Sequence, residues 1–350
     1  MPYDVAAFNF PSQEMITRLV DKHAFDDTDL ISPRFMPVDA KSALNSPKLV
    51  VWDVLEPAKG MTKTSAYGAD PDIVEMRTSA TKAAAPLIFR ESVLIGEDRL
   101  INARKLGSQF ERAGEDLVID AVYGANQRID ARIEKLNFQA LSGRIVENGI
   151  TLVDYDFTAK QLPDVASDPG YGGYYWSDHE HATAISDIYK AVQAFRGTGY
   201  KNVTMIAGQN VMNALAMNAQ VKSLLAGSAF VNQIGTENLV SFLPQILPAR
   251  VKEIISTDAC YPDEETDEPV PFADPSLCYL IASAPGQQLG AFVSTPHLYS
   301  GIGANVEAGR FMKVNYHEQE DVPKVTITSG IFGVPVLYRP DFVVCMKVMA

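Results

Sequence analysis

The sequence is poor in cysteine, and the cysteines that it has are not arranged in pairs. Its 350 residues include 3 cysteines, Cys260, Cys278 and Cys345, with no CxxC spacing among them. A small, odd set argues against a disulfide framework and against a structural zinc site. It is typical of proteins made in a reducing cytoplasm.

Long apolar runs are also missing. No stretch approaches the roughly 20 apolar residues that a membrane-spanning helix needs. The first residues include Asp4, Asn9 and Glu14, whereas a signal peptide needs a basic start followed by an apolar run. We therefore expect no membrane partner and synthesis in the cytoplasm.

Basic residues are outnumbered. Lys plus Arg is 30 and Asp plus Glu is 43, so the net charge is -13. Proteins that bind nucleic acid phosphates tightly usually show the opposite balance. An acidic surface repels DNA and discourages premature self-association. The charge excludes a dedicated nucleic-acid binder and leaves only weak, non-specific contact with DNA.

Nucleotide-binding motifs are absent or incomplete. No GxxxxGK[ST] sequence occurs, so a phosphate-binding loop of that type is excluded. Gly301-Ile302-Gly303 resembles the start of a dinucleotide motif, but position 306 is Val where the third glycine belongs. The Gly-rich segment 170–173 has no Lys or Ser/Thr after it and is interpreted as a loop.

Metal-binding and catalytic patterns are weak. His179 and His181 flank Glu180, but they precede a predicted helix, where Ser177 or Asp178 is expected to act as a cap. The acidic run 263–268 lacks EF-hand spacing and has prolines around it. His23, His297 and His317 stand alone, and no GxSxG motif occurs. We predict no catalytic residue, no cofactor and no metal site.

What the sequence does contain is enough apolar material for a large core. Apolar residues make up 47% and charged residues 21%, which excludes general disorder. A chain of 350 residues is too long for one ordinary compact domain and predicts two or three lobes.

The N-terminal region 1–47 is weakly patterned and interrupted by prolines. A short amphipathic piece at 13–21 is expected within it. One interpretation is a free terminus. We favour an extended arm that orders only against a neighbouring subunit, because a solvated tail seldom keeps so many apolar residues.

Residues 48–106 have the pattern of extended structure. A strand is predicted at 48–55, a second run at 73–81 alternates in polarity, and the loop 56–72 between them is rich in Gly and Pro. The two runs predict a long protruding hairpin. Such a ribbon needs another surface to lie on, because an isolated pair of strands is marginal in water.

The clearest local signal is a helix over 107–141. Its apolar stripe recurs every three or four residues, at Phe110, Ala113, Leu117, Ala121, Ala125, Ile129, Ile133, Leu136 and Ala140. The expected solvent face is charged and includes Asp130 and Glu134. Such a rod is roughly 50 Å long. Gly143 is placed to end it; two helices broken near Gly124 are the alternative.

A β-hairpin is predicted over 144–157, with Asn148-Gly149 as its turn, and a loop over 161–175. Beyond it, 178–320 has the pattern of an α/β lobe. Expected there are helices at 182–196 and 210–226, short elements at 239–247 and 251–256, an acidic, Pro-rich excursion at 258–275, and strands at 203–207, 278–284 and 290–293. The C-terminal segments 322–329 and 334–347 are rich in β-forming residues.

The order of these parts resembles the coat fold of tailed bacteriophages, the Hong Kong 97-like fold, and within it the lambda-type major capsid family. The likeness rests on Leu87–Glu91, Arg132–Ile145, Cys278–Ala284, Gly301, Glu307, Thr328-Ser329 and Pro335–Asp341. The resemblance implies an α+β fold with an N-terminal arm, an extended β-hairpin loop, a long spine helix in a peripheral domain, and an α/β axial domain.

The resemblance also implies a domain division and a function. Residues 1–47 are the expected N-terminal arm, 48–106 the extended loop, 107–177 and 321–350 the peripheral domain, and 178–320 the axial domain. The expected function is that of a non-enzymatic major capsid protein, whose hexamers and pentamers form an icosahedral head shell around the phage genome. Scaffolding, portal and decoration proteins are the expected partners, with assembly in the host cytoplasm and a final location in the virion.

Some coat proteins of this fold cross-link a Lys to an Asn. No local signature singles out Lys59, Lys63 or another lysine here, so we predict no cross-link. Two alternatives stay open: a cellular encapsulin-like nanocompartment shell of the same fold, and an α/β enzyme of a different class.

Overall fold

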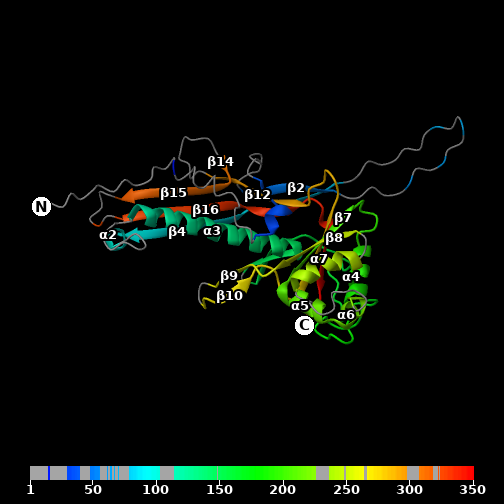
Figure 1. Ribbon diagram of the computed structural model, residues 1–350. Helices are drawn as coiled ribbons and strands as arrows, with labels where there is room; N and C mark the ends of the chain where they lie inside the picture. Colours follow the sequence, from blue (N-terminus) through cyan, green and yellow to red (C-terminus); the bar gives the residue numbers. More distant parts are fainter. Residues whose placement is uncertain are drawn as a thin grey trace.

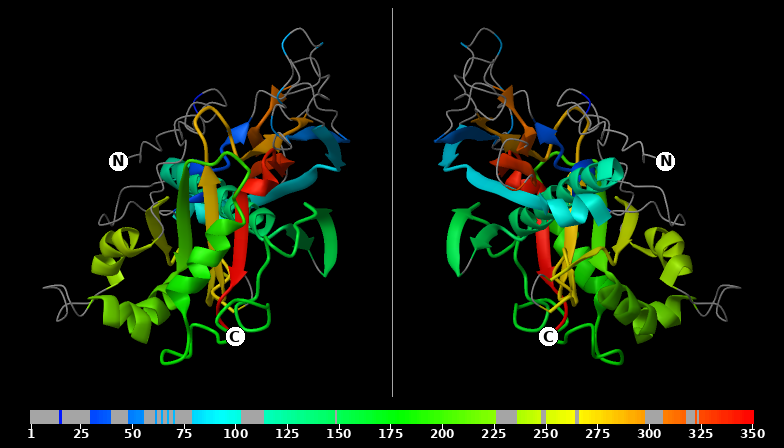
Figure 2. Two further views of the ribbon diagram at one scale, coloured as in Figure 1. Left: turned by 90° about the vertical axis from the view of Figure 1, so that its right-hand side faces the viewer. Right: turned by 90° about the vertical axis from the view of Figure 1, so that its left-hand side faces the viewer.

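The computed structural model describes residues 15, 30–39, 48–55, 61, 64, 67, 70, 79–102, 114–147, 149–225, 236–247, 250–263, 266–297, 307–317, 322 and 324–350. Within these ranges the chain forms two main sheets, each with helices beside it (Figures 1 and 2). Part of the N-terminal region and the predicted runs 13–21, 56–72 and 73–78 lie largely or wholly outside the described residues.

The larger sheet, called the long sheet, is built around one 14-residue strand, β16. Among the described residues it contains β1 (Val38–Asp39), β4 (Leu87–Gly96), β12 (Gly290–Ser294), β15 (Arg310–His317) and β16 (Lys324–Leu337). β4 is antiparallel to β16 from Lys324↔Gly96 to Gly333↔Leu87, and β15 is antiparallel to it from Arg310↔Ile331 to His317↔Lys324.

Helix α3 (Gly114–Leu141) covers one face of the long sheet (Figure 1). Its apolar stripe packs on β4, β15 and β16 at one end, where Val118 and Val122 are buried with Ile327. Toward its other end Leu136 and Ala140 join the main core. The short helix α2 (Glu97–Asn102) links β4 to this region.

The predicted long helix is confirmed over its described part, with differences of detail. Residues 107–113 lie outside the described residues, and α3 runs without a break past Gly124, so the two-helix alternative is wrong. The helix ends at Leu141, and Gly143 follows with φ +94°, a conformation that glycine adopts without strain. An added Cβ there would also meet the Phe157 ring.

The second sheet, called the lobe sheet, has the order β17–β11–β7–β8. Its strands are β7 (Asn202–Gly208), β8 (Val251–Thr257), β11 (Leu277–Ser283) and β17 (Val343–Lys347). Its helices are α4 (Ala184–Gln193), α5 (Gln209–Met217), α6 (Ala219–Leu225) and α7 (Thr236–Ile246). The α/β pattern predicted for this lobe is confirmed.

The helix predicted over 210–226 is instead two helices, because Asn218 breaks it. Asn218 has extended backbone angles (φ −62°, ψ 132°), and its buried side-chain oxygen accepts hydrogen bonds from the backbone N–H groups of Gln220 and Val221. Its amide donates to the Ala182 carbonyl at 2.9 Å. The side chain therefore starts α6 and ties it to the residues before α4.

The remaining strands form two-stranded ribbons. They are β2 (Val50–Leu55) with β3 (Ser79–Ala84), β5 (Arg144–Glu147) with β6 (Ile150–Asp154), β9 (Cys260–Pro262) with β10 (Pro269–Pro271), and β13 (Pro296–His297) with β14 (Glu307–Ala308). The hairpins predicted at 48–81 and 144–157 are thus present. The second strand of the first hairpin is described from Ser79 onward and continues to Ala84.

The strand pairing differs from the predicted domain division at several strands. β4 was placed in the extended loop, and β12 and β15 in the axial domain, yet all three pair with β16. β17 was placed in the peripheral domain, yet it pairs with β11 of the lobe sheet. Sequence patterns report local periodicity, whereas sheet membership depends on partners far along the chain. No local signal separates a strand of the long sheet from a strand of a protruding ribbon.

Candidate assembly surfaces

In the described part of the chain, the β2–β3 hairpin has one face packed on the protein and one exposed face, on which Val51 and Leu55 flank Asp53 and its hydrogen bond from Thr81. The residues of β2 that face the core are Val50, Trp52 and Val54. On the opposite face Val51 is 48% exposed and Leu55 is 44% exposed. The Leu55 backbone N–H donates to the Tyr338 carbonyl at 3.0 Å, which fastens the base of the hairpin to the end of β16.

Apolar side chains continue beyond β2. In the connection between β2 and β3, Met61 is 94% exposed and Tyr67 is fully exposed. Single exposed apolar residues are ordinary on protein surfaces, but apolar residues that gather on a protruding ribbon are typical of an interaction site.

The β5–β6 hairpin repeats this arrangement. Ile145 and Val153 are buried in the main core, and they hold the base of the ribbon. Toward the tip Val146, Ile150 and Leu152 are exposed. Gly149 turns the chain with φ +76°, as the predicted Asn-Gly turn requires.

The face of β4 that points away from α3 adds two further exposed apolar residues, Ile88 and Leu94. The opposite face of β4 contacts the helix: Glu91 forms an ion pair with Arg128 of α3 at 2.9 Å. One side of the long sheet is therefore covered by α3, while β4 presents apolar side chains on the other.

Residues 30–39 pack on the chain itself. The carboxylate of Glu134 in α3 accepts hydrogen bonds from the backbone N–H groups of Ile31 (3.0 Å) and Ser32 (3.1 Å) and from the Ser32 hydroxyl (2.5 Å). Ser32 begins the 3-10 turn η1 (Ser32–Arg34), and Arg34 makes a two-pronged ion pair with Glu253 of β8. The expectation that the whole arm orders only against a neighbouring subunit is therefore wrong for this segment.

The burial of Glu134 also corrects the expected solvent face of the long helix. Glu134 is 1% exposed, and burial raises its pKa although the bonds from Ser32 and Ile31 lower it. Asp130, one turn earlier, is buried against Arg310 of β15. Both acids were predicted to be solvated. Charge alone gave the wrong answer because each acid has its own partner from a distant segment.

Arg132 makes a further polar contact of α3, this time with the β5–β6 hairpin. Arg132 forms an ion pair with Glu147 of β5 at 2.8 Å, and its guanidinium lies 4.7 Å from the centre of the Phe89 ring in β4. Helix α3 is thus joined to the neighbouring strands by polar as well as apolar contacts, and the turn end of the β5–β6 hairpin is held against α3 through Glu147.

The histidines flagged in the sequence do not form a metal centre in the described part of the chain. The His181 ring lies 3.0 Å from the Asp178 carboxylate, which also accepts hydrogen bonds from the backbone N–H groups of Glu180 and His181. These bonds, the backbone bond from His181 first, lower the pKa of Asp178. Asp178 therefore caps a turn, and not the helix itself, since α4 begins only at Ala184 with Thr183 before it.

The other flagged residues are spread over the molecule. Cys278 and Cys345 are buried in neighbouring strands of the lobe sheet, where burial raises both thiol pKa values, while Cys260 is exposed on β9. Residues 301–306 and 264–265 lie outside the described residues. Across the described ranges, no group of three His, Cys, Asp or Glu residues is placed to hold a metal.

A shallow hollow of about 250 Å³ lies beside α5 and the C-terminus. Its lining residues are Ser177, His179, Asn210, Asn213, Ala214, Met217 and Met349. The lining contains Ser177 and His179 but no carboxylate that could orient the histidine. Within the described residues, no helix is long and apolar enough to cross a membrane.

The architecture is that of known phage-related structures. A protein assigned as the capsid protein of a prophage of Escherichia coli CFT073 matches with a TM-score of 0.59 and 16% identity, over 97% of this chain and 99% of that one. A phage-related protein from Bordetella bronchiseptica RB50 matches with a TM-score of 0.56 and 11% identity, over 94% of this chain and 96% of that one. No curated protein matches the sequence.

The fold is the Hong Kong 97-like coat fold that the resemblance implied. The family described as phage major capsid protein E matches residues 48–270. The chain belongs to this family, so it is a structural protein of the phage capsid and not an enzyme. The lambda-type recognition made from the sequence is confirmed, and the enzyme alternative is wrong.

Proposed function

We propose that this chain assembles into hexamers and pentamers that build the icosahedral head of a tailed phage around its double-stranded DNA. Assembly takes place in the host cytoplasm. Scaffolding, portal and decoration proteins are the proposed partners besides further copies of the chain itself. The observation that carries this proposal is that both the β2–β3 and the β5–β6 ribbon expose several apolar side chains in the described part of the chain.

The energetic argument is that these faces cost free energy in an isolated subunit. Each square ångström of apolar surface removed from water contributes about 25 cal/mol. The outward side chains of β2, such as Val51 and Leu55, recover this only when another molecule covers them. Moderate contacts suffice, because each subunit of a shell makes several at once and their effects multiply.

The charge supports a weak relation to DNA. With a net charge of -13, the subunit does not attract a polyanion as a whole, and contacts to packaged DNA are non-specific. An acidic lining keeps DNA free to enter and leave. Tight binding of duplex DNA to purified shells at physiological salt would contradict this part.

We propose the domain division with four strands reassigned according to their sheet partners: β4, β12 and β15 to the peripheral domain and β17 to the axial domain. Residues 1–47 form the N-terminal arm, and the extended loop is the β2–β3 ribbon with its connection. The peripheral domain contains α3 together with the long sheet, including β4, β12 and β15. The axial domain is the lobe sheet with α4–α7. Its acidic β9–β10 hairpin contacts α3, where Lys135 donates a hydrogen bond to the Tyr261 hydroxyl at 2.7 Å.

Negative-stain electron microscopy of the expressed protein tests the proposal, with size-exclusion chromatography as a first screen. We expect closed particles, or rings of five and six subunits. A chain that stays monomeric under all conditions, with or without its co-expressed phage partners, contradicts shell building. Particles that protect enzymes and no DNA, and that lack a portal, would favour the encapsulin-like alternative.

A further inference from the structure

The long sheet and the lobe sheet are joined by two short crossings that run side by side. One crossing, residues 284–289, leads from β11 to β12. The other, residues 338–342, leads from β16 to β17 and contains the 3-10 turn η2 (Pro340–Phe342). The two sheets share the main hydrophobic core, and the crossings add polar contacts at the point where the chain passes from one sheet to the other.

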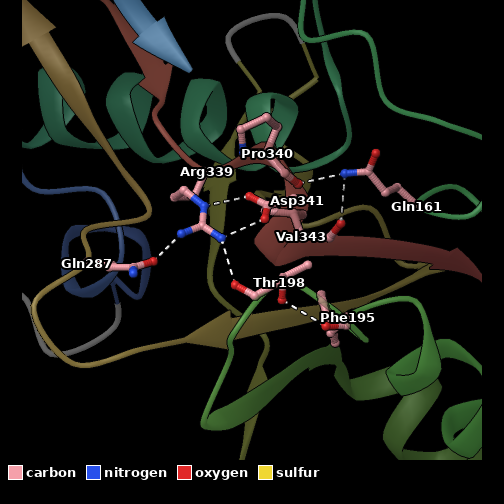
Figure 3. Close-up of polar contacts among 8 residues, drawn as sticks. All are labelled: Gln161, Phe195, Thr198, Gln287, Arg339, Pro340, Asp341 and Val343. Carbon is pink, nitrogen blue, oxygen red and sulfur yellow. Dashed lines mark hydrogen bonds and ion pairs between the residues drawn. The ribbon is translucent and has the colours of Figure 1, made fainter. Parts of the chain in front are cut away.

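Arg339 lies at the centre of this junction and is 1% exposed (Figure 3). Its Nε and Nη2 donate to the Asp341 carboxylate at 2.8 and 2.6 Å. Nη2 also donates to the Thr198 carbonyl at 3.0 Å, and Nη1 donates to the side-chain oxygen of Gln287. The guanidinium therefore joins the second crossing, the first crossing and the turn after α4.

Backbone bonds reinforce the same contact between the crossings. The N–H groups of Tyr338 and Arg339 both donate to the Leu289 carbonyl, at 3.0 and 3.1 Å. The Phe342 ring centre lies 3.9 Å from the Arg339 guanidinium. The Tyr338 carbonyl in turn accepts from Leu55, so the β2–β3 ribbon is fastened to the same point.

Gln161 fixes the far end of the second crossing. Its side-chain amide donates to the Pro340 carbonyl at 2.6 Å and to the Val343 carbonyl at 3.3 Å (Figure 3). The entry of the chain into β17 is thereby held from the loop that follows the β5–β6 hairpin.

We propose that these contacts of Arg339 with Asp341, Gln287 and Thr198, called the Arg339 clamp, set the angle between the two sheets and thereby the curvature of the assembled shell. The part that concerns curvature rests on the proposed shell function. A buried ion pair is weak evidence for a gain in stability, because desolvation offsets much of the attraction. A planar guanidinium with all its nitrogens committed is instead suited to fixing geometry.

The sharpest variant is Gln287→Ala, because it removes the side-chain bond between the two crossings and leaves the Arg339–Asp341 pair intact. Gln288→Ala is the matched control: this neighbouring residue is also exposed, and its side chain donates to the Gly290 carbonyl at the start of β12 and not to the second crossing. Arg339→Lys is a stronger variant, because lysine keeps the charge but lacks the planar fork.

The angle is measured as a distance between two spin labels on the full-length protein. Lys313→Cys on β15 and Lys222→Cys on α6 place one exposed label on each sheet's side of the junction. Cys260→Ser removes the exposed native thiol, and Cys278 and Cys345 are buried. Labelled chains diluted into unlabelled chains keep neighbouring copies from contributing to the signal.

We expect Gln287→Ala to broaden the distance distribution and Arg339→Lys to broaden and shift it, while Gln288→Ala matches the parent. In assembled preparations the first two should give a wider spread of particle diameters. Distributions identical to the parent for both clamp variants would overturn the proposal. The distance measurement needs no particles, so failure of the parent to assemble would count against the shell function and leave the test of the angle intact.

Discussion

Strands β16 and β2 are both rich in apolar residues, yet they differ in how far they are buried and in how many strands lie beside them. β16 lies between β4 on one edge and β15 and β12 on the other, with α3 across one face, and it is buried along most of its length. β2 pairs only with β3 among the described residues, and its burial alternates residue by residue. Composition does not separate the two strands; their neighbours do.

The comparison shows which apolar side chains are buried within one subunit and which are not. The apolar side chains of β16 are mostly buried, because segments distant in the sequence, such as β4 and α3, pack beside it. The β2–β3 ribbon buries only its inward face, through Val50, Trp52 and Val54, and its outward face keeps Val51 and Leu55 exposed on either side of Asp53. Substitutions in β16 and on the inward face of β2 should therefore change folding, and substitutions on the outward face should change association.

The largest loss of stability is expected for Trp52→Ala on the inward face of β2. Trp52 is packed in the main core, and truncating a buried Trp costs about 3–5 kcal/mol through lost burial and the cavity left behind. Chemical denaturation of the unassembled protein measures the effect. Trp52→Phe, which keeps most of the apolar volume, is the control and should lose much less.

Gly330→Ala in β16 should lower the free energy of unfolding by about 1–3 kcal/mol, the usual cost of overpacking. An added Cβ at this position meets the Phe89 carbonyl of β4 and the Phe311 ring of β15. Gly124→Ala in α3 is the matched control, because its Cβ meets nothing within 4 Å. That change should stabilise by about 0.5–1 kcal/mol through helix propensity. Equal effects of the two substitutions would contradict the packing described for β16.

Glu134→Gln should cost about 1 kcal/mol near pH 5, because it replaces one of the two carboxyl oxygens that accept hydrogen bonds from Ile31 and Ser32. The pKa of Glu134 is raised above its usual 4.5 in the folded protein. The folded state then holds the proton more tightly, so this site's contribution to stability falls as pH rises from about 4.5 through the folded pKa. The difference between parent and variant should shrink over that range in denaturation curves. Amide hydrogen exchange at Ile31 and Ser32 should be faster in the variant.

The same substitution on alternate faces of β2 gives the smallest effect and the sharpest contrast. Val50→Thr buries a hydroxyl at a position that is 1% exposed and should cost about 1 kcal/mol. Val51→Thr keeps the β-branched shape at a position that is 48% exposed and should stay within about 0.5 kcal/mol of the parent. A larger loss for Val51→Thr than for Val50→Thr in the unassembled protein would show that the two faces are assigned wrongly.

Much of the fold could be predicted from the sequence, because periodicity is a local property. The long helix, the Asn-Gly hairpin and the alternation of the lobe between helices and strands all follow from apolar spacing and turn residues. Asn218 occupies a position of the apolar stripe between Leu215 and Val221, but one polar residue in a stripe does not by itself predict that the helix breaks there. The break depends on the side chain of Asn218 and on its distant partner Ala182.

The candidate surfaces were only partly predictable. The ribbon at 48–55 was recognised as needing another surface, which the exposed Val51 and Leu55 support. The attachment of residues 30–39 was missed, because nothing near Ser32 indicates that Glu134, far along the chain, will accept its hydrogen bonds. The Arg339 clamp was missed for the same reason, since its members Thr198, Gln287 and Asp341 come together only in three dimensions.

The most direct test of the central claim is particle formation by Val51→Thr and Leu55→Thr combined, compared with the parent at equal concentration by electron microscopy. We predict that the variant remains folded, with an unchanged denaturation midpoint of the unassembled subunit, and that it forms far fewer closed particles. Full assembly of the variant, with particles of parental number and size, would contradict the claim that the outward face of β2 binds a neighbouring copy.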